Sequence, residues 1–201
     1  MNEAFAQYAL LGYFLAYFLF AFVWRSFVVF KRTGINPFVL RNSDDAHGYV
    51  GRAVKLVVVG CAVVVALDAL LPDAASWLGS YRVLEARTVR VVGWVLLFAA
   101  LAWLLAAQVQ MGASWRIGID SQHRTALVQG GLFAISRNPI FLAMRVTLLG
   151  LFLVLPSAAT LSLLVAGEIL MQVQVRLEEE HLASLHGAEY AAYCQRVRRW
   201  L

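Results

Sequence analysis

Five long runs of apolar residues limit what this chain can fold into. They cover residues 5–30, 54–71, 89–110, 140–155 and 157–175. A helix needs roughly 17–25 residues to cross the hydrocarbon layer of a membrane, and in lipid it satisfies its own backbone hydrogen bonds. The chain is 61% hydrophobic and only 14% charged, whereas soluble domains are ~45–50% apolar and ~25% charged. These features predict an all-α integral membrane protein with about five transmembrane helices.

The last two runs are separated by Pro156 and Ser157, residues that favour a turn. We therefore expect these runs to form a helical hairpin with a short first arm, followed by a short helical tail. No internal repeat or low-complexity segment divides the sequence. The chain is expected to be one polytopic membrane domain over residues 1–201, with a three-helix part over 1–110 and the hairpin and tail over 111–201.

Positive charges concentrate on one side of the expected membrane. Twelve Lys and Arg residues fall in segment 31–55, in segment 111–138 and from residue 176 onward, whereas three lie in the opposite loop, between residues 82 and 90. Because short cytoplasmic loops are rich in Lys and Arg, we expect an outside N-terminus, five crossings and a cytoplasmic C-terminus. The basic residues flank apolar runs, so the net charge of +5 indicates membrane lipids as partners and not nucleic acid.

The cysteines and histidines show neither a disulfide pattern nor a metal-binding pattern. Cys61 and Cys194 lie far apart in the chain, and both are expected to be free thiols. The four histidines show no ligand spacing except for His181 and His186, which are five residues apart. No metal site is therefore expected.

An arginine, an asparagine and a proline stand at the start of the fourth run. One interpretation is purely local: Asn138 is a good N-cap, Pro139 suits the first helical position, and Arg137 would reach toward lipid headgroups. The other interpretation is a ligand site. Two glycines open the preceding segment 130–133, where the backbone could approach a ligand closely, and a helix N-terminus attracts anions.

A polar stripe runs down the fifth helix and out of the membrane. At ~100° per residue, Glu168, Gln172, Arg176 and Glu179 share one side of that helix over ~16 Å. An acidic residue inside a membrane is a candidate functional residue. A structural alternative exists, because Arg145 lies ten residues before the expected turn and Glu168 twelve residues after it. Antiparallel arms would place the two at similar depth, where they could neutralise each other.

The tail combines acids, tyrosines and arginines. Residues 178–180 are glutamates, of which at most two can point into one site because consecutive helix residues do not share a face. Gly187 follows, then Tyr190 and Tyr193, then arginines within 196–199. One alternative is a solvated charge run followed by an amphipathic helix on the anionic leaflet, with tyrosines at the interface and arginines on phosphate.

The segment 42–48 (NSDDAHG) is expected to open the helix of the second run. Asn42 or Ser43 can cap that helix, and Asp44 and Asp45 suit its first turn. The alternative is a loop that gates a substrate.

Taken together, these pieces resemble the membrane methyltransferases typified by isoprenylcysteine carboxyl methyltransferase, with the phospholipid N-methyltransferases as relatives. The family pattern is a Gly-x-Tyr turn, Arg-His-Pro-x-Tyr at a helix start, a helical hairpin, Glu-Glu-x-x-Leu, a glycine, Tyr-x-x-Tyr and a basic residue. The matching stretches are GLF 131–133, RNPIF 137–141, a hairpin broken at Pro156, EEEHL 178–182, Gly187, YAAY 190–193 and RVR 196–198. The resemblance covers roughly residues 111–201. Five positions depart from it: Asn138 replaces histidine, Phe133 and Phe141 replace tyrosines, Ala143 replaces glycine, and Arg198 stands where a proline often follows.

The resemblance implies an S-adenosylmethionine site at the cytoplasmic ends of the last two helices, closed by the tail, so that 111–201 would be the cofactor-binding part. The cofactor-binding residues would be Gly130, Gly131, Leu132, Phe133, Asn138, Glu178, Glu179, Tyr190 and Tyr193. Either glutamate would accept hydrogen bonds from the ribose or the methionine ammonium, and a tyrosine would flank the adenine.

The implied reaction is methyl transfer to a lipophilic membrane acceptor, foremost the carboxylate of an isoprenylcysteine, with phospholipids or other small amines and thiols as alternatives. Arg137 or Arg176 would bind the cofactor carboxylate or orient an acidic acceptor. Glu168 would act as base only for an amine or thiol, because a carboxylate is already ionised at neutral pH. Two rival functions are a sterol-reductase-like enzyme that uses NADPH and a non-enzymatic membrane scaffold.

Overall fold

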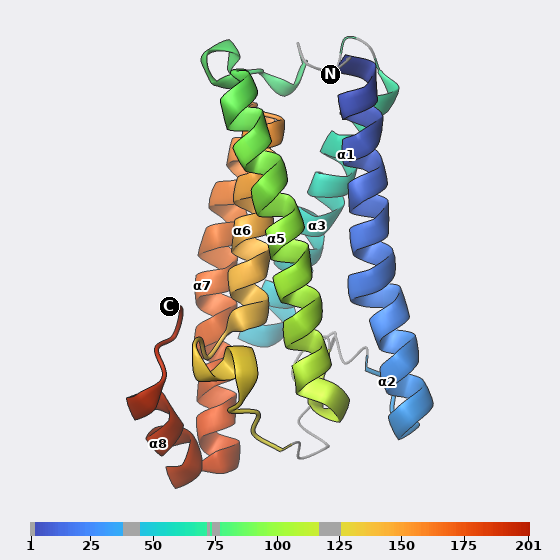
Figure 1. Ribbon diagram of the computed structural model, residues 1–201. Coiled ribbons are helices and arrows are strands. Elements are labelled where there is room, and N and C mark those ends of the chain that lie inside the picture. The colour runs from blue at the N-terminus through green and yellow to red at the C-terminus, as the bar shows by residue number, and fades with distance from the viewer. Residues whose placement is uncertain (1–2, 38–44, 72, 74–76, 117–125) are drawn as a thin grey trace.

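The computed structural model describes residues 3–37, 45–71, 73, 77–116 and 126–201, which form a bundle of long helices (Figure 1). The first rod is continuous and consists of α1 (Glu3–Phe18), a π-helical segment η1 (Leu19–Trp24) and α2 (Arg25–Thr33). The remaining α-helices are α3 (Ala46–Leu70), α5 (Arg87–Met111), α6 (Pro139–Val154), α7 (Ala158–His186) and α8 (Ala188–Arg196). Short 3-10 helices are η2 (Arg82–Leu84), η3 (Gly112–Ser114) and η4 (Gly131–Ala134).

Four stretches of helix are long and apolar enough to cross a membrane: Ala6–Thr33, Ala46–Leu70, Arg87–Ser114 and Ala158–His186. α6 is also apolar but has 16 residues. At 1.5 Å per residue it is about 24 Å long, which is less than the ~30 Å of a typical hydrocarbon layer. The predicted all-α membrane architecture is confirmed, with four to five helices that can span, and the fourth is the short one, as expected.

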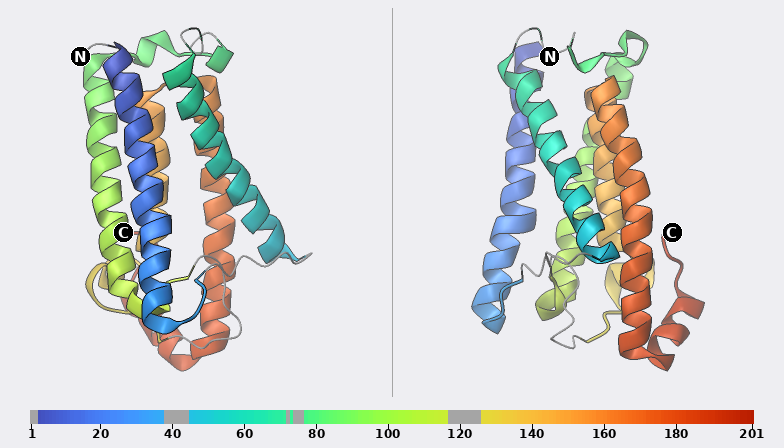
Figure 2. Two further views of the ribbon diagram at one scale, coloured as in Figure 1. Left: turned by 90° about the vertical axis from the view of Figure 1, so that its right-hand side faces the viewer. Right: turned by 180° about the vertical axis from the view of Figure 1, so that it is seen from behind.

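α6 lies between α5 and α7, while α3 packs on α7 and α1 packs on α3 (Figures 1 and 2). Glycines allow the close approach of α5 to α6. A Cβ atom on Gly93 would lie 2.9 Å from the backbone nitrogen of Val154, and one on Gly150 would lie 3.1 Å from the carbonyl oxygen of Gly93. Small residues at such contacts are typical of membrane helices, and this contact anchors the short helix in the bundle.

The turn of the α6–α7 hairpin lies where the sequence predicts it, at Pro156 and Ser157. Ser157 is the N-cap of α7, and its hydroxyl accepts a hydrogen bond from the backbone nitrogen of Thr160 at 3.2 Å. The Thr160 hydroxyl in turn accepts one from the backbone nitrogen of Ser157 at 3.1 Å. This reciprocal capping fixes the start of α7 and with it the depth at which each residue of the hairpin lies.

α3 begins at Ala46, well before the apolar run at residue 54, because Asp45 caps it. The Asp45 carboxylate accepts a hydrogen bond from the backbone nitrogen of Gly48 at 2.8 Å. The expectation that Asp45 belongs to the first turn is therefore wrong, since it is the capping residue itself. The other predicted capping and first-turn residues, Asn42, Ser43 and Asp44, lie outside the described residues.

α7 continues past the apolar run, which ends at residue 175, as far as His186. Gly187 then adopts a φ of 54°, a conformation that favours glycine, and the chain enters α8. After α8 the tail runs back along the hairpin toward the middle of the bundle (Figure 1). This return brings the tail beside the start of α6, where the polar residues gather.

Candidate functional site

Glu179 lies at the centre of a polar cluster at one end of the bundle, and only 9% of the residue is exposed. Its carboxylate accepts hydrogen bonds from the Asn138 amide at 2.9 Å and from Nη2 and Nε of Arg199 at 2.8 and 3.0 Å. Arg137 donates through Nε at 3.3 Å, and its Nη2 lies 3.2 Å from the carboxylate. One carboxylate therefore joins α7, the residues that precede α6, and the tail that follows α8.

The local interpretation of the Arg-Asn-Pro stretch holds for Pro139, which occupies the start of α6, with Asn138 at the N-cap position. The Asn138 side chain, however, forms no capping hydrogen bond and donates to Glu179 instead. The Arg137 side chain is only 12% exposed, so the predicted reach toward lipid headgroups is wrong. A buried carboxylate has to be hydrogen-bonded. Arg137 and Asn138 therefore donate to Glu179, and not to the membrane surface or the helix end.

The backbone of the tail is bound to the same residues. Nη1 of Arg137 donates to the carbonyl oxygens of Cys194 at 3.2 Å and Val197 at 3.3 Å. The backbone nitrogen of Arg137 donates to the carbonyl oxygen of Arg198 at 2.9 Å. The hydrogen bond to Glu179 raises the pKa of the Arg199 guanidinium, which keeps the group charged at neutral pH. These contacts fasten the tail over the start of α6.

Tyr190 and Tyr193 are buried, with 3% and 2% of each residue exposed, and they pack with Val197. The Tyr193 hydroxyl donates to the carbonyl oxygen of Phe133 at 2.6 Å, and burial raises the pKa of Tyr193 to about 12. Burial also raises the pKa of Tyr190, whose hydroxyl has no hydrogen-bond partner among the described residues. The alternative of tyrosines at a membrane surface is therefore wrong, because α8 packs its tyrosines against the protein.

The glycine segment before α6 forms the 3-10 helix η4. Gly131 has a φ of 61°, and a Cβ atom there would lie 2.5 Å from Oε1 of Gln110. That same oxygen accepts a hydrogen bond from the backbone nitrogen of Leu132 at 2.7 Å. Gly131 thus allows the end of α5 to approach the backbone closely, whereas a Cβ atom on Gly130 would meet nothing within 4 Å.

Glu178 points in a different direction from Glu179, because the two are ~100° apart around α7. Two buried residues, Met171 and Val175, lie seven and three residues before Glu178, on the same side of α7. Glu178 is itself partly buried, and within the part of the chain that the structure describes it forms no hydrogen bond or ion pair. Such a carboxylate is costly and is available to a ligand.

The polar stripe of α7 forms a second, separate network. Arg145 pairs with Glu168 as predicted, at 2.6 and 2.9 Å. Gln172 donates to Glu168 at 2.8 Å, and Arg176 donates to the side-chain oxygen of Gln172 at 2.9 Å. The indole ring of Trp200, from the tail, lies 4.3 Å from the Arg145 guanidinium carbon, a cation–π contact.

The predicted site residues therefore divide into two groups. Arg137, Asn138 and Glu179 are in direct contact, and Phe133 is tied to the same region through Tyr193. Glu168 and Arg176 engage other partners, on the hairpin stripe. The structure does not bring them into the cluster around Glu179.

Three contributors to this region were missed by sequence reasoning. Gln110 binds the η4 backbone, Ser136 donates to the carbonyl oxygen of Arg199 at 3.3 Å, and Trp200 covers Arg145. The adjacent Arg199 and Trp200 were a weak signal, because a cation and an aromatic ring at a chain end suit both a protein contact and a membrane surface. Gln110 and Ser136 carried no signal in the sequence.

The comparisons with known proteins fit this arrangement. No curated protein matches the chain. The family model for phospholipid methyltransferases matches residues 88–189, which run from the start of α5 to the start of α8 and make up just over half of the chain. The matched region contains Arg137, Asn138, Glu178 and Glu179. The chain therefore belongs to the phospholipid methyltransferase family, a family of membrane methyltransferases.

Proposed function

We propose that this protein transfers a methyl group from S-adenosylmethionine to a lipophilic acceptor in the membrane. Family membership supports the reaction class. The observation that carries the proposal is the arrangement at the end of α7. There Glu179 holds the start of α6 and the tail together, and the neighbouring Glu178 remains without a partner among the described residues.

The residues present fit S-adenosylmethionine. This cofactor has a cationic ammonium, ribose hydroxyls and an aromatic adenine, and the region offers polar counterparts to the first two. Glu178 can accept from the ammonium or the ribose. Two buried polar atoms, Oη of Tyr190 and Nε2 of His186, have no partner in the described part of the chain and can bond to a polar ligand. The Tyr190 and Tyr193 rings lie 6.0 Å apart and are buried with Val197, so they support the region and leave no ring face exposed for the adenine.

The two glutamates take different roles in this proposal. Glu179 already accepts from two arginines and an asparagine, so it organises the site and need not contact the cofactor. Glu178 is the carboxylate that binds it. Arg137 is held by Glu179 and by tail carbonyls, so it positions the tail over the cofactor.

S-adenosylmethionine supplies an activated methyl group on a sulfonium sulfur. The protein then has to align the acceptor with that methyl group and exclude water, and good alignment can supply ~7–11 kcal/mol of the barrier. The tail, fastened to the start of α6 through Arg137, excludes water from the start of α6. A carboxylate acceptor needs no base, whereas an ammonium acceptor has to lose a proton before it attacks.

Two acceptors are supported by different observations. The resemblance of 131–198 to isoprenylcysteine carboxyl methyltransferases supports the carboxylate of an isoprenylcysteine. The family match supports a phospholipid amine, and the charges favour it as well. Arg137, Arg145 and Arg199 are already paired with glutamates, which leaves none of these three to orient an acidic acceptor.

We place the cofactor site on the cytoplasmic side of the membrane. The ends of α2 and α5, the start of α3, η4 and α8 all lie at one end of the bundle (Figure 1), and the Lys- and Arg-rich segments belong to that end. The excess of positive charge supports a cytoplasmic location for it.

Calorimetric titration of the detergent-purified protein with S-adenosylmethionine tests the proposal. We expect micromolar binding by the wild type and at least tenfold weaker binding by Glu178→Gln, a loss of ~1.4 kcal/mol. Glu180→Gln is the matched control, because Glu180 is exposed on the same helix. Absence of binding by the folded wild type would overturn the proposal, and titration with NADPH would then test the reductase alternative.

A further inference from the structure

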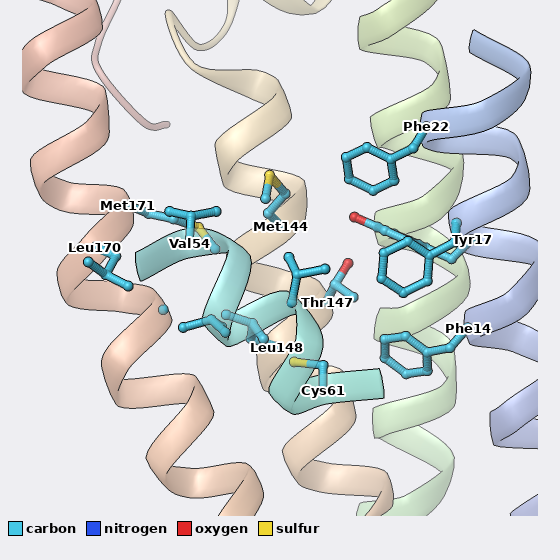
Figure 3. Close-up of a pocket in the computed structure, with 14 residues that line it drawn as sticks. Phe14, Tyr17, Phe22, Val54, Cys61, Met144, Thr147, Leu148, Leu170 and Met171 are labelled. Carbon is cyan, nitrogen blue, oxygen red and sulfur yellow. The ribbon is translucent and has the colours of Figure 1, made fainter. Parts of the chain in front are cut away.

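An apolar cleft lies inside the bundle between the first rod, α3 and the hairpin (Figure 3). Its interior cavity volume is about 60 Å³, and the rest of the space between its walls is open to the surroundings. The fourteen lining residues are Phe14, Tyr17, Phe18, Phe22, Val54, Val57, Val58, Cys61, Met144, Thr147, Leu148, Gly167, Leu170 and Met171. A single buried water needs ~10–15 Å³ of such volume, so the cleft has room for a narrow group such as part of a hydrocarbon chain.

The lining suits a hydrocarbon chain. All four helical segments that form the walls belong to stretches that can lie in the membrane, so the cleft is at the depth of lipid chains. Its oxygen-bearing side chains are Tyr17 and Thr147, and the Thr147 hydroxyl is already bound to the carbonyl oxygen of Ala143 at 3.0 Å. The remaining side chains are aliphatic, aromatic or sulfur-containing, apart from Gly167. Such a surface offers little to a polar ligand.

The shape of the cleft suits one chain that lies along the helices. On α3 it extends from Val54 to Cys61, seven residues, or roughly 10 Å. Phe14 and Cys61 lie at one end and Phe22 and Val54 at the other (Figure 3). The second end faces the side of the bundle where η4 and the tail lie.

The cleft and the cofactor site share one face of α7. Gly167 and Met171 line the cleft, and Glu178 lies on the same face seven residues beyond Met171, ~10 Å farther along the axis. A molecule with its chain in the cleft would therefore carry its headgroup toward Glu178. A lipid of the bulk membrane gains nothing from this orientation, whereas a methyl acceptor has to place its headgroup beside the cofactor.

The walls of the cleft come from two parts of the sequence. Six lining residues belong to α6 and α7, inside the region that matches the family. The other eight belong to α1, η1 and α3, before residue 88. The helices before the matched region thus contribute to the cleft but not to the proposed cofactor site.

We propose that the cleft binds the hydrocarbon chain of the methyl acceptor, and that the first rod and α3 select that chain. This inference rests on the proposed function for the identity of the acceptor. Phe14 and Cys61 set the depth to which the chain can enter, so they are specificity-determining residues outside the family-matched region.

Photolabelling tests the site without relying on activity. Two probes would be used with the detergent-purified protein: a phosphatidylethanolamine and a farnesylcysteine, each with a diazirine on its hydrocarbon chain. We expect the labels on residues 14–22 and 54–61. Cys61→Phe fills the cleft and should reduce labelling at least fivefold. Val63→Phe is the control, because Val63 is 49% exposed on the outer side of the same helix, and labelling should stay within twofold of the wild type.

The two probes show which acceptor chain the cleft takes, because only the matching one should be displaced by its unlabelled form. Labelling that is spread over the exposed faces of the helices, or that is unchanged in Cys61→Phe, would overturn the inference. S-adenosylmethionine binding is measured on the same variants and should stay within twofold. If the wild type binds no S-adenosylmethionine while Cys61→Phe still blocks labelling, the proposed function fails and the chain-binding site stands.

A second variant keeps the test valid if Cys61→Phe does not fold. Phe14→Ala enlarges the deep end of the cleft without adding bulk, and it should move the label to residues deeper in the bundle for a probe with a longer chain. An unchanged labelling pattern for both chain lengths would contradict a depth limit set by Phe14.

Discussion

At the residue scale, two neighbouring glutamates behave differently because of their positions around one helix. Glu179 faces the tail and accepts from three side chains. Glu178 faces the bundle interior and has no partner among the described residues. A sequence motif of two acids therefore contains one carboxylate that organises the site and one that is open to a ligand. The sequence alone could not assign these roles, since either glutamate is able to take either role.

Replacing Glu179 by Gln should destabilise the protein, because Arg137 and Arg199 would lose their anionic partner. Hydrogen bonds to charged groups contribute about 1.5–3 kcal/mol, so we expect a loss of about 2 kcal/mol. Thermal unfolding in detergent would show this as a lower midpoint, with Glu180→Gln as the control. A midpoint equal to that of the control would mean that the cluster does not stabilise the tail.

The pair of Arg145 and Glu168 should show coupling in a double-mutant cycle. Arg145→Gln and Glu168→Gln each remove one partner of a 2.6 Å contact, so the double variant should be less destabilised than the sum of the single variants. Pairs in contact couple by roughly 0.5–3 kcal/mol, and we expect about 1 kcal/mol from unfolding measurements. Strict additivity would show that the pair is incidental.

At the element scale, the position of η4 depends on a glycine and on a helix that is distant in sequence. Gly131 needs a positive φ, and Gln110 at the end of α5 fills the space next to it. The sequence indicated a glycine turn here, but it could not show which of the two glycines matters. That depends on the approach of α5, a contact between residues 22 positions apart.

Gly131→Ala should therefore be destabilising, whereas Gly130→Ala should not. The left-handed conformation costs a residue with a Cβ atom roughly 1–2 kcal/mol, and the displaced Gln110 side chain adds to this. Gly130 has a φ of −97° and open space around it. Unfolding midpoints of the two variants check this, and equal midpoints would contradict the close approach.

Helix boundaries were predictable to the extent that apolar length and local caps determine them. The hairpin turn followed from the turn-favouring residues Pro156 and Ser157, and the pairing of Arg145 with Glu168 followed from counting residues on the two antiparallel arms. Asn138 occupies the predicted N-cap position, but its side chain does not cap the helix, because an asparagine that can cap a helix can also donate to a buried carboxylate. Such a choice is decided by tertiary contacts and not by the local sequence.

At the scale of the whole molecule, the resemblance implied that the tail closes the site, but neither the path of the tail along the hairpin nor the cleft could be predicted. The contact of Arg199 with Glu179 requires α8 to pack its tyrosines inward, which the Tyr-Ala-Ala-Tyr sequence of 190–193 does not reveal. Phe14, Tyr17 and Phe22 recur at a helical spacing, but a lipid-facing helix shows the same spacing. Only the packing of the first rod against α3 and the hairpin shows that these rings line a cleft.

In the whole molecule, two parts of the chain take two different roles. The region that matches the family supplies most of the proposed cofactor site, and the helices before it supply most of the cleft walls. Exchange of the first rod and α3 with those of a relative should change the preferred acceptor chain and leave S-adenosylmethionine affinity within about threefold. A parallel change in both would contradict the division.

The central claim is methyl transfer, and transfer of a radiolabelled methyl group tests it most directly. The protein would be reconstituted in vesicles with phosphatidylethanolamine, with and without farnesylcysteine, and supplied with labelled S-adenosylmethionine. The account predicts label in the extracted lipid for the wild type and for Glu180→Gln, and at least tenfold less for Glu178→Gln. The absence of label from every lipid with folded wild-type protein, or full transfer by Glu178→Gln, would contradict it.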